Sequence, residues 1–312
     1  MRWTFVAAFW LGFLLSESAG RESLTIATYN VENYGLANRM TDAGFRPEYP
    51  KPERQKAALR RVIRALNADI VVLQEIGGEA YLEELARDLR GEGCDYPFRA
   101  IVDAADAERK LGLLARVRPV AFVPHAGLTI DYRGEVVPVK RGLLEARFPT
   151  PAGELALFGV HLKSRYTDRA DDPQSAARRT AEAASIRDAV LRVFPDPSRA
   201  LFVIVGDFND SKDSPALQRF RRRGQTPLAE LMPAFDSRGE AWTHAYAKRD
   251  TYTRVDHVLL SPGLRQQDGI GAIARVFDGD GVREASDHRP VVLTLRFEGQ
   301  QKGGSEDPPL AK

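Results

Sequence analysis

The chain has 312 residues and a formal net charge of +2, which excludes a protein whose whole surface is a basic nucleic-acid footprint. Hydrophobic residues make up 43% of it, enough for a sizeable core, so disorder is excluded for most of its length. Since Cys94 is the only cysteine, no intramolecular disulfide can stabilise the fold.

The first 20 residues have the pattern of a secretory signal peptide. Arg2 precedes an apolar run from Phe5 to Leu15, and small residues follow up to Gly20. The run of about 11 residues is shorter than the roughly 20 that span a bilayer, which argues against a stable membrane anchor. We expect cleavage after Gly20 and a secreted or periplasmic protein.

Alternating strands and helices open the remaining chain. A strand is predicted at 24–29 and a helix at 53–67, where apolar residues recur at the spacing of one helical face. The run 70–73 is apolar on both faces, which predicts a buried strand in a sheet covered by helices. A second helix is predicted at 79–90.

Short strands separated by turns follow, a texture typical of an antiparallel or mixed sheet. They are predicted at 111–117, 121–123, 136–139, 143–148 and 155–160. A helix over 174–193 and strands at 201–205, 255–260 and 291–297 complete the pattern. We expect one mixed α/β domain over residues 22–298 and a disordered tail over 299–312.

Polar side chains able to do chemistry gather at the ends of these strands, where sites of α/β sheets form. Six positions carry them: Asn30 with Glu32, Gln74 with Glu75, His161 to Ser164, Gly206 to Asp210, Asp256, and Asp287 with His288. Each has a structural alternative, such as a turn capped by its own Asp or Asn. Their joint appearance at strand ends is what those alternatives do not explain.

The carboxylates suggest a site for a hard cation. Glu75 ends a buried strand, where an isolated charge costs too much unless it is paired, hydrogen-bonded or metal-bound. Asp207 and Asn209 lie two residues apart and can project on the same side of an extended segment. Oxygen ligands of this kind suit Mg²⁺ or Mn²⁺ better than zinc.

Two of the five histidines lie beside these carboxylates. His161 can donate to a phosphate oxygen or a leaving group. We expect Asp256 to accept from one nitrogen of His288, which fixes the tautomer and leaves the other nitrogen for a substrate. Asp287 then remains for a metal, whereas the structural alternative is a capped turn with a surface salt bridge.

Taken in order, the motifs resemble the endonuclease/exonuclease/phosphatase superfamily over roughly residues 24 to 297. They are YNVEN at 29–33, LQE at 73–75, HLKS at 161–164, GDFND at 206–210, RVDHVLLS at 254–261 and SDHRP at 286–290. The resemblance implies a four-layer α/β sandwich, in which two packed mixed β-sheets are flanked by helices. With the signal pattern, the chain looks most similar to exported bacterial members.

The resemblance also implies a metal site. Glu75 would be the main ligand of Mg²⁺ or Mn²⁺, with Asp287 as a second acidic ligand or close partner and Asn30 beside them.

The other matched positions are implied to act on water and phosphate. Asp207 and Asn209 would orient or deprotonate water and hold the phosphate. His288, held by Asp256, would contact the scissile phosphate, and His161 would stabilise charge or protonate the leaving oxygen. Family members are described with either the Asp207-type or the His288-type residue as general base, and we favour Asp207.

We therefore predict metal-dependent hydrolysis of phosphate esters by activated water, foremost by a secreted or periplasmic nuclease. Basic clusters near 165–179 and 219–223 favour a nucleic acid substrate. A phosphatase or phosphodiesterase for small or lipid-linked phosphates is the alternative, and the absence of an exposed apolar hairpin or aromatic run argues against a lipid. A noncatalytic binding domain is disfavoured, because every acidic and imidazole position is present. No protein partner is evident.

Overall fold

The computed structural model describes residues 22–41, 43–167 and 169–298. The predicted signal peptide of residues 1–20 and the predicted tail of residues 299–312 lie outside these ranges. Among the described residues, no helix has both the length and the apolar content needed to cross a bilayer.

The first sheet has seven strands in the order β16-β20-β21-β1-β4-β6-β5. Their bounds are β1 (Ser23–Tyr34), β4 (Ile70–Ile76), β5 (Phe98–Val102), β6 (Lys110–Ala115), β16 (Ala234–Phe235), β20 (Ile270–Val276) and β21 (Val291–Phe297). β1 runs parallel to β4 and antiparallel to β21, so the sheet is mixed.

The second sheet has six strands in the order β15-β19-β12-β11-β10-β7. Their bounds are β7 (Ala121–His125), β10 (Leu143–Thr150), β11 (Gly153–His161), β12 (Phe202–Asp207), β15 (Glu230–Leu231) and β19 (Asp256–Leu260). β11 and β12 are parallel, whereas β19 pairs antiparallel with β12.

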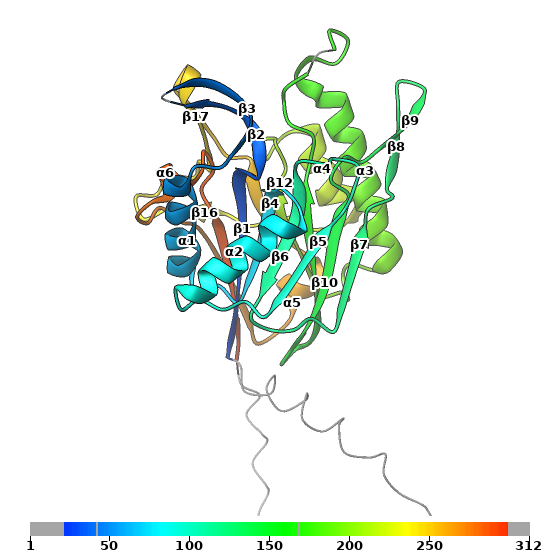
Figure 1. The fold of residues 1–312 in the computed structure, drawn as a ribbon. Coiled ribbons are helices and arrows are strands. Elements are labelled where there is room, and N and C mark those ends of the chain that lie inside the picture. The colour runs from blue at the N-terminus through cyan, green and yellow to red at the C-terminus, as the bar shows by residue number, and fades with distance from the viewer. Residues whose placement is uncertain (1–21, 42, 168, 299–312) are drawn as a thin grey trace, which may run out of the picture.

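The two sheets pack face to face, and helices cover their outer faces (Figure 1). The helices α1 (Glu53–Leu66) and α2 (Glu79–Gly91) pack on the first sheet, and α3 (Ala176–Val193) and α4 (Pro215–Arg221) on the second. Two short helices, α5 (Pro262–Gln266) and α6 (Val282–Ala285), and the 3₁₀ turns η1 (Pro173–Ser175) and η2 (Ala247–Arg249) complete the set. The predicted four-layer α/β sandwich is confirmed.

Strand β4 shows why its sequence is apolar without interruption. Ile70 and Val72 belong to the core between the sheets, whereas Val71 and Leu73 belong to the core under α1 and α2. Successive side chains of a strand point to opposite faces, so a strand buried on both faces needs apolar residues at every position.

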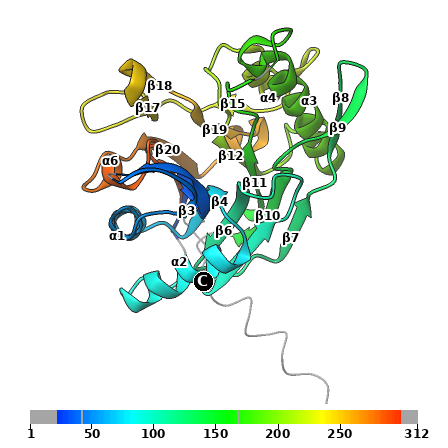
Figure 2. The same cartoon turned by 45° about the horizontal axis from the view of Figure 1, so that its top comes forward.

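Four two-stranded hairpins project from this frame. They are β2 (Leu36–Thr41) with β3 (Gly44–Pro50), β8 (Thr129–Tyr132) with β9 (Glu135–Pro138), β13 (Arg222–Arg223) with β14 (Thr226–Pro227), and β17 (His244–Tyr246) with β18 (Thr251–Thr253). In Figures 1 and 2, β2–β3, β8–β9 and β17–β18 lie at one end of the sandwich, opposite the end where the described chain begins and stops.

The hairpin β2–β3 corrects the expectation that no apolar hairpin is exposed. Met40 and Phe45 on this hairpin are 78% and 60% exposed. The alternation of a strand is inverted here: Arg39 takes the inner side and donates to the backbone oxygens of Asn33 and Tyr49, which turns the apolar neighbours outward. The prediction was wrong because the inner face of this hairpin contacts backbone oxygens and not a hydrophobic core, so its apolar side chains face solvent.

Candidate active site

Three of the sequence-predicted residues form one row across the second sheet. His161 ends β11, Asp207 ends β12 and Asp256 begins β19. The strand register pairs His161 with Asp207 and Asp207 with Asp256. Because β19 is antiparallel to its neighbour, its first residue meets the last residues of the other two strands at the same edge. All three side chains are buried.

The first sheet contributes Asn30 and Glu75 to the same place. Asn30 Nδ2 donates to Asp207 Oδ2 at 3.0 Å, a bond that joins the two sheets. Glu75 Oε2 accepts from the backbone N–H of Asn33 at 3.0 Å, and Glu75 Oε1 lies 3.8 Å from His161 Nε2. The site therefore straddles the seam between the sheets.

Irregularities in the backbone of the first sheet orient the site residues that this sheet carries. The pairing of β1 with β4 shifts between Asn30 and Tyr34, and that of β4 with β6 shifts at Glu75. Glu32, Asn33 and Glu75 all have φ in the left-handed region, at 48°, 52° and 64°. Bulges redirect side chains, and left-handed non-glycine residues cost free energy and cluster at functional sites.

The carboxylate of Asp207 is held by amide groups on both sides. Its Oδ1 accepts from the backbone N–H of Asn209 at 2.8 Å, and its Oδ2 accepts from Asn209 Nδ2 at 3.1 Å as well as from Asn30. Burial, together with the negative charge of Asp256, raises the pKa of Asp207 to about 7. This carboxyl group can therefore accept a proton near neutral pH.

Gly206 allows Asp207 to reach this position. Its φ is 148°, and a Cβ at this residue would lie 2.0 Å from the carbonyl oxygen of Val160. Only glycine fits between the ends of β11 and β12.

His288 is oriented by Asp256, with His288 Nδ1 2.8 Å from Asp256 Oδ2. Burial lowers the pKa of His288, but the charge and hydrogen bond of Asp256 and the charges of Asp207 and Asp287 together hold it well above its usual value. The imidazole is therefore a cation at neutral pH. Ser286 fixes its loop, because the Ser286 hydroxyl donates to the backbone oxygen of Asn30 at 2.8 Å and accepts from the His288 N–H at 3.0 Å.

His161 has the opposite character. Burial, reinforced by the positive charges of Arg141 and His288, lowers its pKa well below the usual value, so the ring is neutral. His161 Nε2 lies 3.6 Å from Asp207 Oδ2, and its buried Nδ1 has no hydrogen-bond partner among the described residues.

Three carboxylates gather on the side of the first sheet, and we call Glu32, Glu75 and Asp287 the acidic group. Burial and the charges of Asp287 and Glu75 raise the pKa of Glu32, although Lys51, with Nζ 3.5 Å from Glu32 Oε2, opposes this. Such mutual repulsion is what a bound cation relieves, and oxygen donors fit Mg²⁺ or Mn²⁺. The donor set therefore fits a divalent metal.

Proximity alone gives two other triplets whose ligand atoms lie within 4.8 Å of one another in the described residues: His244, Asp287 and His288, and Asp207, Asp256 and His288. In the second triplet, Nδ1 of His288 is occupied by Asp256, and Asp207 is bonded by Asn30 and Asn209. Hydrogen bonds within the protein therefore already engage atoms of the second triplet that a metal would otherwise use.

His244 is a site residue that was not predicted from the sequence. Its Nε2 lies 3.5 Å from Asp287 Oδ2, and its ring centroid lies 4.6 Å from that of His288. It stands on β17, paired with His288 by an isolated bridge. Since β17 has only three residues, no periodicity in the sequence indicated it.

Arg141 is a second residue that was not predicted from the sequence. It is 6% exposed, its Nη2 lies 3.0 Å from Asp106 Oδ2, and its Nε and Nη1 have no partner among the described residues. Burial and the charges of Arg141 and Lys140 lower the pKa of Lys163 to about 8. The positive charges of Arg109 and Lys163 act with that of Arg141 to lower the pKa of His161. The only signal was the pair Lys140-Arg141 just before a buried strand.

Two other polar residues of the matched motifs serve the scaffold. Asp210 Oδ2 accepts from the buried Arg179 Nε at 2.9 Å, and its backbone oxygen lies 2.9 Å from His257 Nε2. Burial lowers the pKa of His257 to about 4, so this histidine is a neutral core residue.

The sequence model of the Endonuclease/Exonuclease/phosphatase family matches residues 27–288, and the chain belongs to this family. The family generally comprises metal-dependent phosphoesterases. No curated protein matches the chain.

Several solved structures share the fold. A family protein from Bacteroides vulgatus is 15% identical and covers 89% of this chain and 100% of its own, with a TM-score of 0.59. The human Nocturnin catalytic domain, solved with a bound sulfate anion, is 14% identical and covers 88% of this chain and 94% of its own, with a TM-score of 0.59. Beta toxin from Staphylococcus aureus is 15% identical and covers 86% and 99%, also with a TM-score of 0.59. At such identities the likeness shows the fold alone.

Proposed function

We propose that the protein is a divalent-metal-dependent phosphodiesterase, and that it acts as a secreted or periplasmic nuclease. The observation that carries the proposal is the row of His161, Asp207 and Asp256, bonded through Asn30 to the sheet that bears the acidic group. In this arrangement Asp207, whose carboxyl group titrates near neutral pH, lies beside the imidazolium of His288 and the neutral imidazole of His161.

Asp207 is the general base of the proposed reaction. With a pKa of about 7, its carboxylate can accept a proton from water at neutral pH, the range in which proton transfer is most effective. Asn30 and Asn209 donate to Oδ2 from their amide groups and keep the carboxylate in one orientation.

His288 and His161 act on the phosphate oxygens. The His288 cation is fixed through Nδ1 by Asp256, and its Nε2–H can donate to a nonbridging oxygen as negative charge develops. The neutral His161 can stabilise the charge that develops on the leaving oxygen by donating an N–H hydrogen bond to it.

Arg141 provides a separate argument for an anionic substrate. Two buried guanidinium donors without partners are costly in the free protein, and an oxygen of a phosphate would satisfy them. The charge of Arg141 lowers the pKa of His161, so the guanidinium acts on the row electrostatically. The positive charge around it favours a polyanion such as nucleic acid.

Glu75 and Asp287 would hold the metal, with the amide oxygen of Asn30 beside them. Asn30 Oδ1 accepts one hydrogen bond, from the Glu32 N–H at 3.0 Å, and keeps a second lone pair. When bound, Mg²⁺ or Mn²⁺ would supply charge that screens a nonbridging oxygen and the leaving oxygen.

A lipid-linked phosphate is the second candidate substrate, because one observation favours it. The exposed Met40 and Phe45 lie on the hairpin β2–β3, which directly follows the strand of Asn30. Apolar side chains beside a site are a means of contact with a lipid surface.

The test uses the purified protein without residues 1–20. Plasmid DNA, RNA, phospholipid vesicles and sugar phosphates are incubated with Mg²⁺, Mn²⁺, Ca²⁺ or a chelator, and product release is measured. We expect metal-dependent cleavage of nucleic acid, with an affinity that falls steeply with salt as counterions are released. Hydrolysis of phospholipid alone would transfer the assignment to the lipid candidate, and no hydrolysis of any phosphoester would overturn the function.

Variants connect the activity to the site. Asp207→Ala and His288→Ala should each lose activity by about 100-fold to 1000-fold. Asp268→Asn is the matched control, because Asp268 is exposed just before β20, at the end of the sheet opposite the site. Normal activity in both site variants would contradict the assignment.

A further inference from the structure

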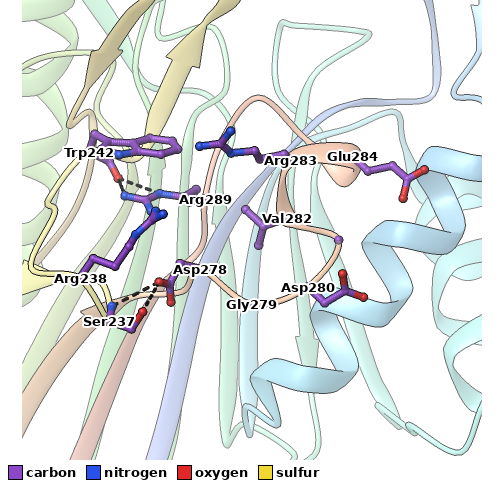
Figure 3. A pocket seen from close by; sticks show the side chains of 11 residues that line it. Ser237, Arg238, Trp242, Asp278, Gly279, Asp280, Val282, Arg283, Glu284 and Arg289 are labelled. Atoms are coloured by element: carbon purple, nitrogen blue, oxygen red, sulfur yellow. Dashed lines mark hydrogen bonds between the residues drawn. The ribbon is translucent and has the colours of Figure 1, made fainter.

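A cavity of about 330 Å³ opens directly beside the acidic group. Its lining includes the acidic residues Glu32 and Asp287 and the aromatic and cationic residues Trp242, Tyr246, Tyr252 and Arg283. A second cavity, of about 650 Å³, shares Trp242 and Arg283 with it and extends to Ser237 and Asp278 (Figure 3). The proposed reaction uses none of these aromatic and cationic side chains.

The aromatic wall belongs to the hairpin β17–β18 and the segment before it. The rings of Trp242 and Tyr252 lie 4.9 Å apart at 60°, and the two tyrosines, Tyr246 and Tyr252, are 43% and 51% exposed. The same hairpin carries His244, which lies beside Asp287 and His288. A planar group bound here would therefore lie next to the scissile phosphate.

Trp242 is fixed before any ligand arrives. Its Nε1 donates to Glu240 Oε2 at 2.8 Å, and the guanidinium of Arg289 lies 3.4 Å from the ring centroid. Arg289 Nε also donates to the Trp242 backbone oxygen at 3.0 Å, and its Nη1 bonds the buried Asp236 Oδ2 at 2.7 Å. A wall held in this way loses little conformational entropy on binding.

Arg283 is the cation of this surface that no carboxylate of the described residues pairs. It lies 6.0 Å from the Trp242 ring, whereas its neighbour Glu284 is paired with Arg54 and Arg61. Figure 3 shows Arg283 directed toward Trp242, while Glu284 and Asp280 lie on the side of α1. An unpaired guanidinium next to an aromatic ring suits a phosphate that follows a stacked base.

We propose that these cavities bind the nucleotide next to the scissile phosphate, with its base against Trp242 and Tyr252 and its phosphate on Arg283. This inference rests on the proposed phosphodiesterase function and names its substrate class. An acyl chain does not fit, because Asp250 and Arg283 lie in the same wall and would be desolvated without a charged partner. Alternation of an aromatic ring with a cation matches the alternation of base and phosphate in a single strand.

The test compares two single-stranded oligonucleotides that differ only in an abasic residue next to a defined cleavable linkage. Trp242→Ala should raise KM for the complete strand about tenfold, as expected for loss of one stacked base, and leave KM for the abasic strand nearly unchanged. Arg283→Gln should raise KM for both strands, because both keep the phosphate. Trp242→Phe, which retains a ring, should restore most of the affinity, and thermal unfolding of each variant checks the fold.

The small diester bis(4-nitrophenyl) phosphate tests the proposed phosphodiesterase function separately from the nucleotide site. If the wild-type protein hydrolyses neither this diester nor any strand with any metal, the proposed function itself fails. If the wild type cleaves the complete strand but Trp242→Ala changes both strands equally or neither, only the nucleotide site is overturned. Hydrolysis of the small diester without cleavage of any strand also overturns it.

Discussion

Asn30 and Asp207 are 177 positions apart in the chain, yet Asn30 Nδ2 donates to Asp207 Oδ2 at 3.0 Å across the seam between the two sheets. Because Asn30 also bonds the Glu32 N–H through Oδ1, one amide group connects the acidic group to the proposed general base. Together with the His288–Asp256 hydrogen bond, this side chain fixes the two halves of the site relative to each other.

Replacement of Asn30 should disable the site without unfolding the protein. Asn30→Ala removes one of the donors that hold the buried carboxylate of Asp207, and we expect kcat to fall on the order of 100-fold. Steady-state kinetics at saturating metal measure this, with Asp268→Asn as the control. An unchanged kcat would mean that Asn209 alone positions Asp207.

The contribution of Asp256 should depend entirely on His288. Asp256→Asn keeps the size of the side chain but removes the charge that holds the imidazolium, and we expect a loss of about 100-fold in kcat. Residues that act as a unit are strongly non-additive, so Asp256→Asn combined with His288→Ala should be no slower than His288→Ala alone. Multiplicative losses in the double variant would show that Asp256 acts independently.

The strand-end clusters were predicted because they leave local signals, whereas the four-layer sandwich was predicted from the resemblance of the ordered motifs to a known family. Ile70 to Leu73 is apolar at every position because it is buried on both faces, and Glu75 stands out because it follows this run after a single residue, Gln74. What the sequence could not give is register: that His161, Asp207 and Asp256 share a row depends on pairing between β11, β12 and β19.

The strands and site residues that were not predicted from the sequence lie where the hydrophobic pattern is weak or inverted. β20 lies at 270–276 and contains Gly271 and two alanines, residues of low strand propensity, so it was not predicted. Arg141, His244 and Trp242 stand in turns or in very short strands, where no periodicity reports burial. Their roles come only from the three-dimensional contacts.

Removal of Arg141 should weaken substrate binding more than stability. We expect Arg141→Gln to lower kcat/KM roughly 10-fold to 100-fold, the range for loss of a hydrogen bond to a charged group. Asp106→Asn is the matched control, because it removes the carboxylate that pairs with Arg141 but leaves the arginine in place. Equal losses in the two variants would indicate that the ion pair, and not the free donors, matters.

Metal binding should be visible without any substrate. Since a cation relieves repulsion within the acidic group, saturating Mn²⁺ should raise the midpoint of thermal unfolding of the wild-type protein relative to the chelated protein. Glu75→Gln and Asp287→Asn should each lose most of that increase, because each removes a charged ligand. Glu22→Gln, outside the site at the start of the described chain, should respond as the wild type does. A full increase in both site variants would place the metal elsewhere.

His257 should make the protein acid-sensitive in a defined window. Burial lowers its pKa from 6.5 to about 4 in the folded state, so below about pH 6.5 the unfolded chain takes up a proton that the folded protein does not. The free energy of unfolding should therefore fall as the pH drops from 6.5 to 4, by a maximum of about 3 kcal/mol from this group, and the loss should level off below pH 4.

His257→Gln isolates this effect, because glutamine has a donor able to bond the Asp210 oxygen but no proton to gain. We expect the free energy of unfolding of the wild type, measured with urea in the presence of a chelator, to decrease relative to that of the variant across this window. Comparison with the variant cancels the other groups that titrate there, such as Asp207. Parallel pH curves for the two proteins would show that His257 is protonated in the folded state and that its burial carries no such cost.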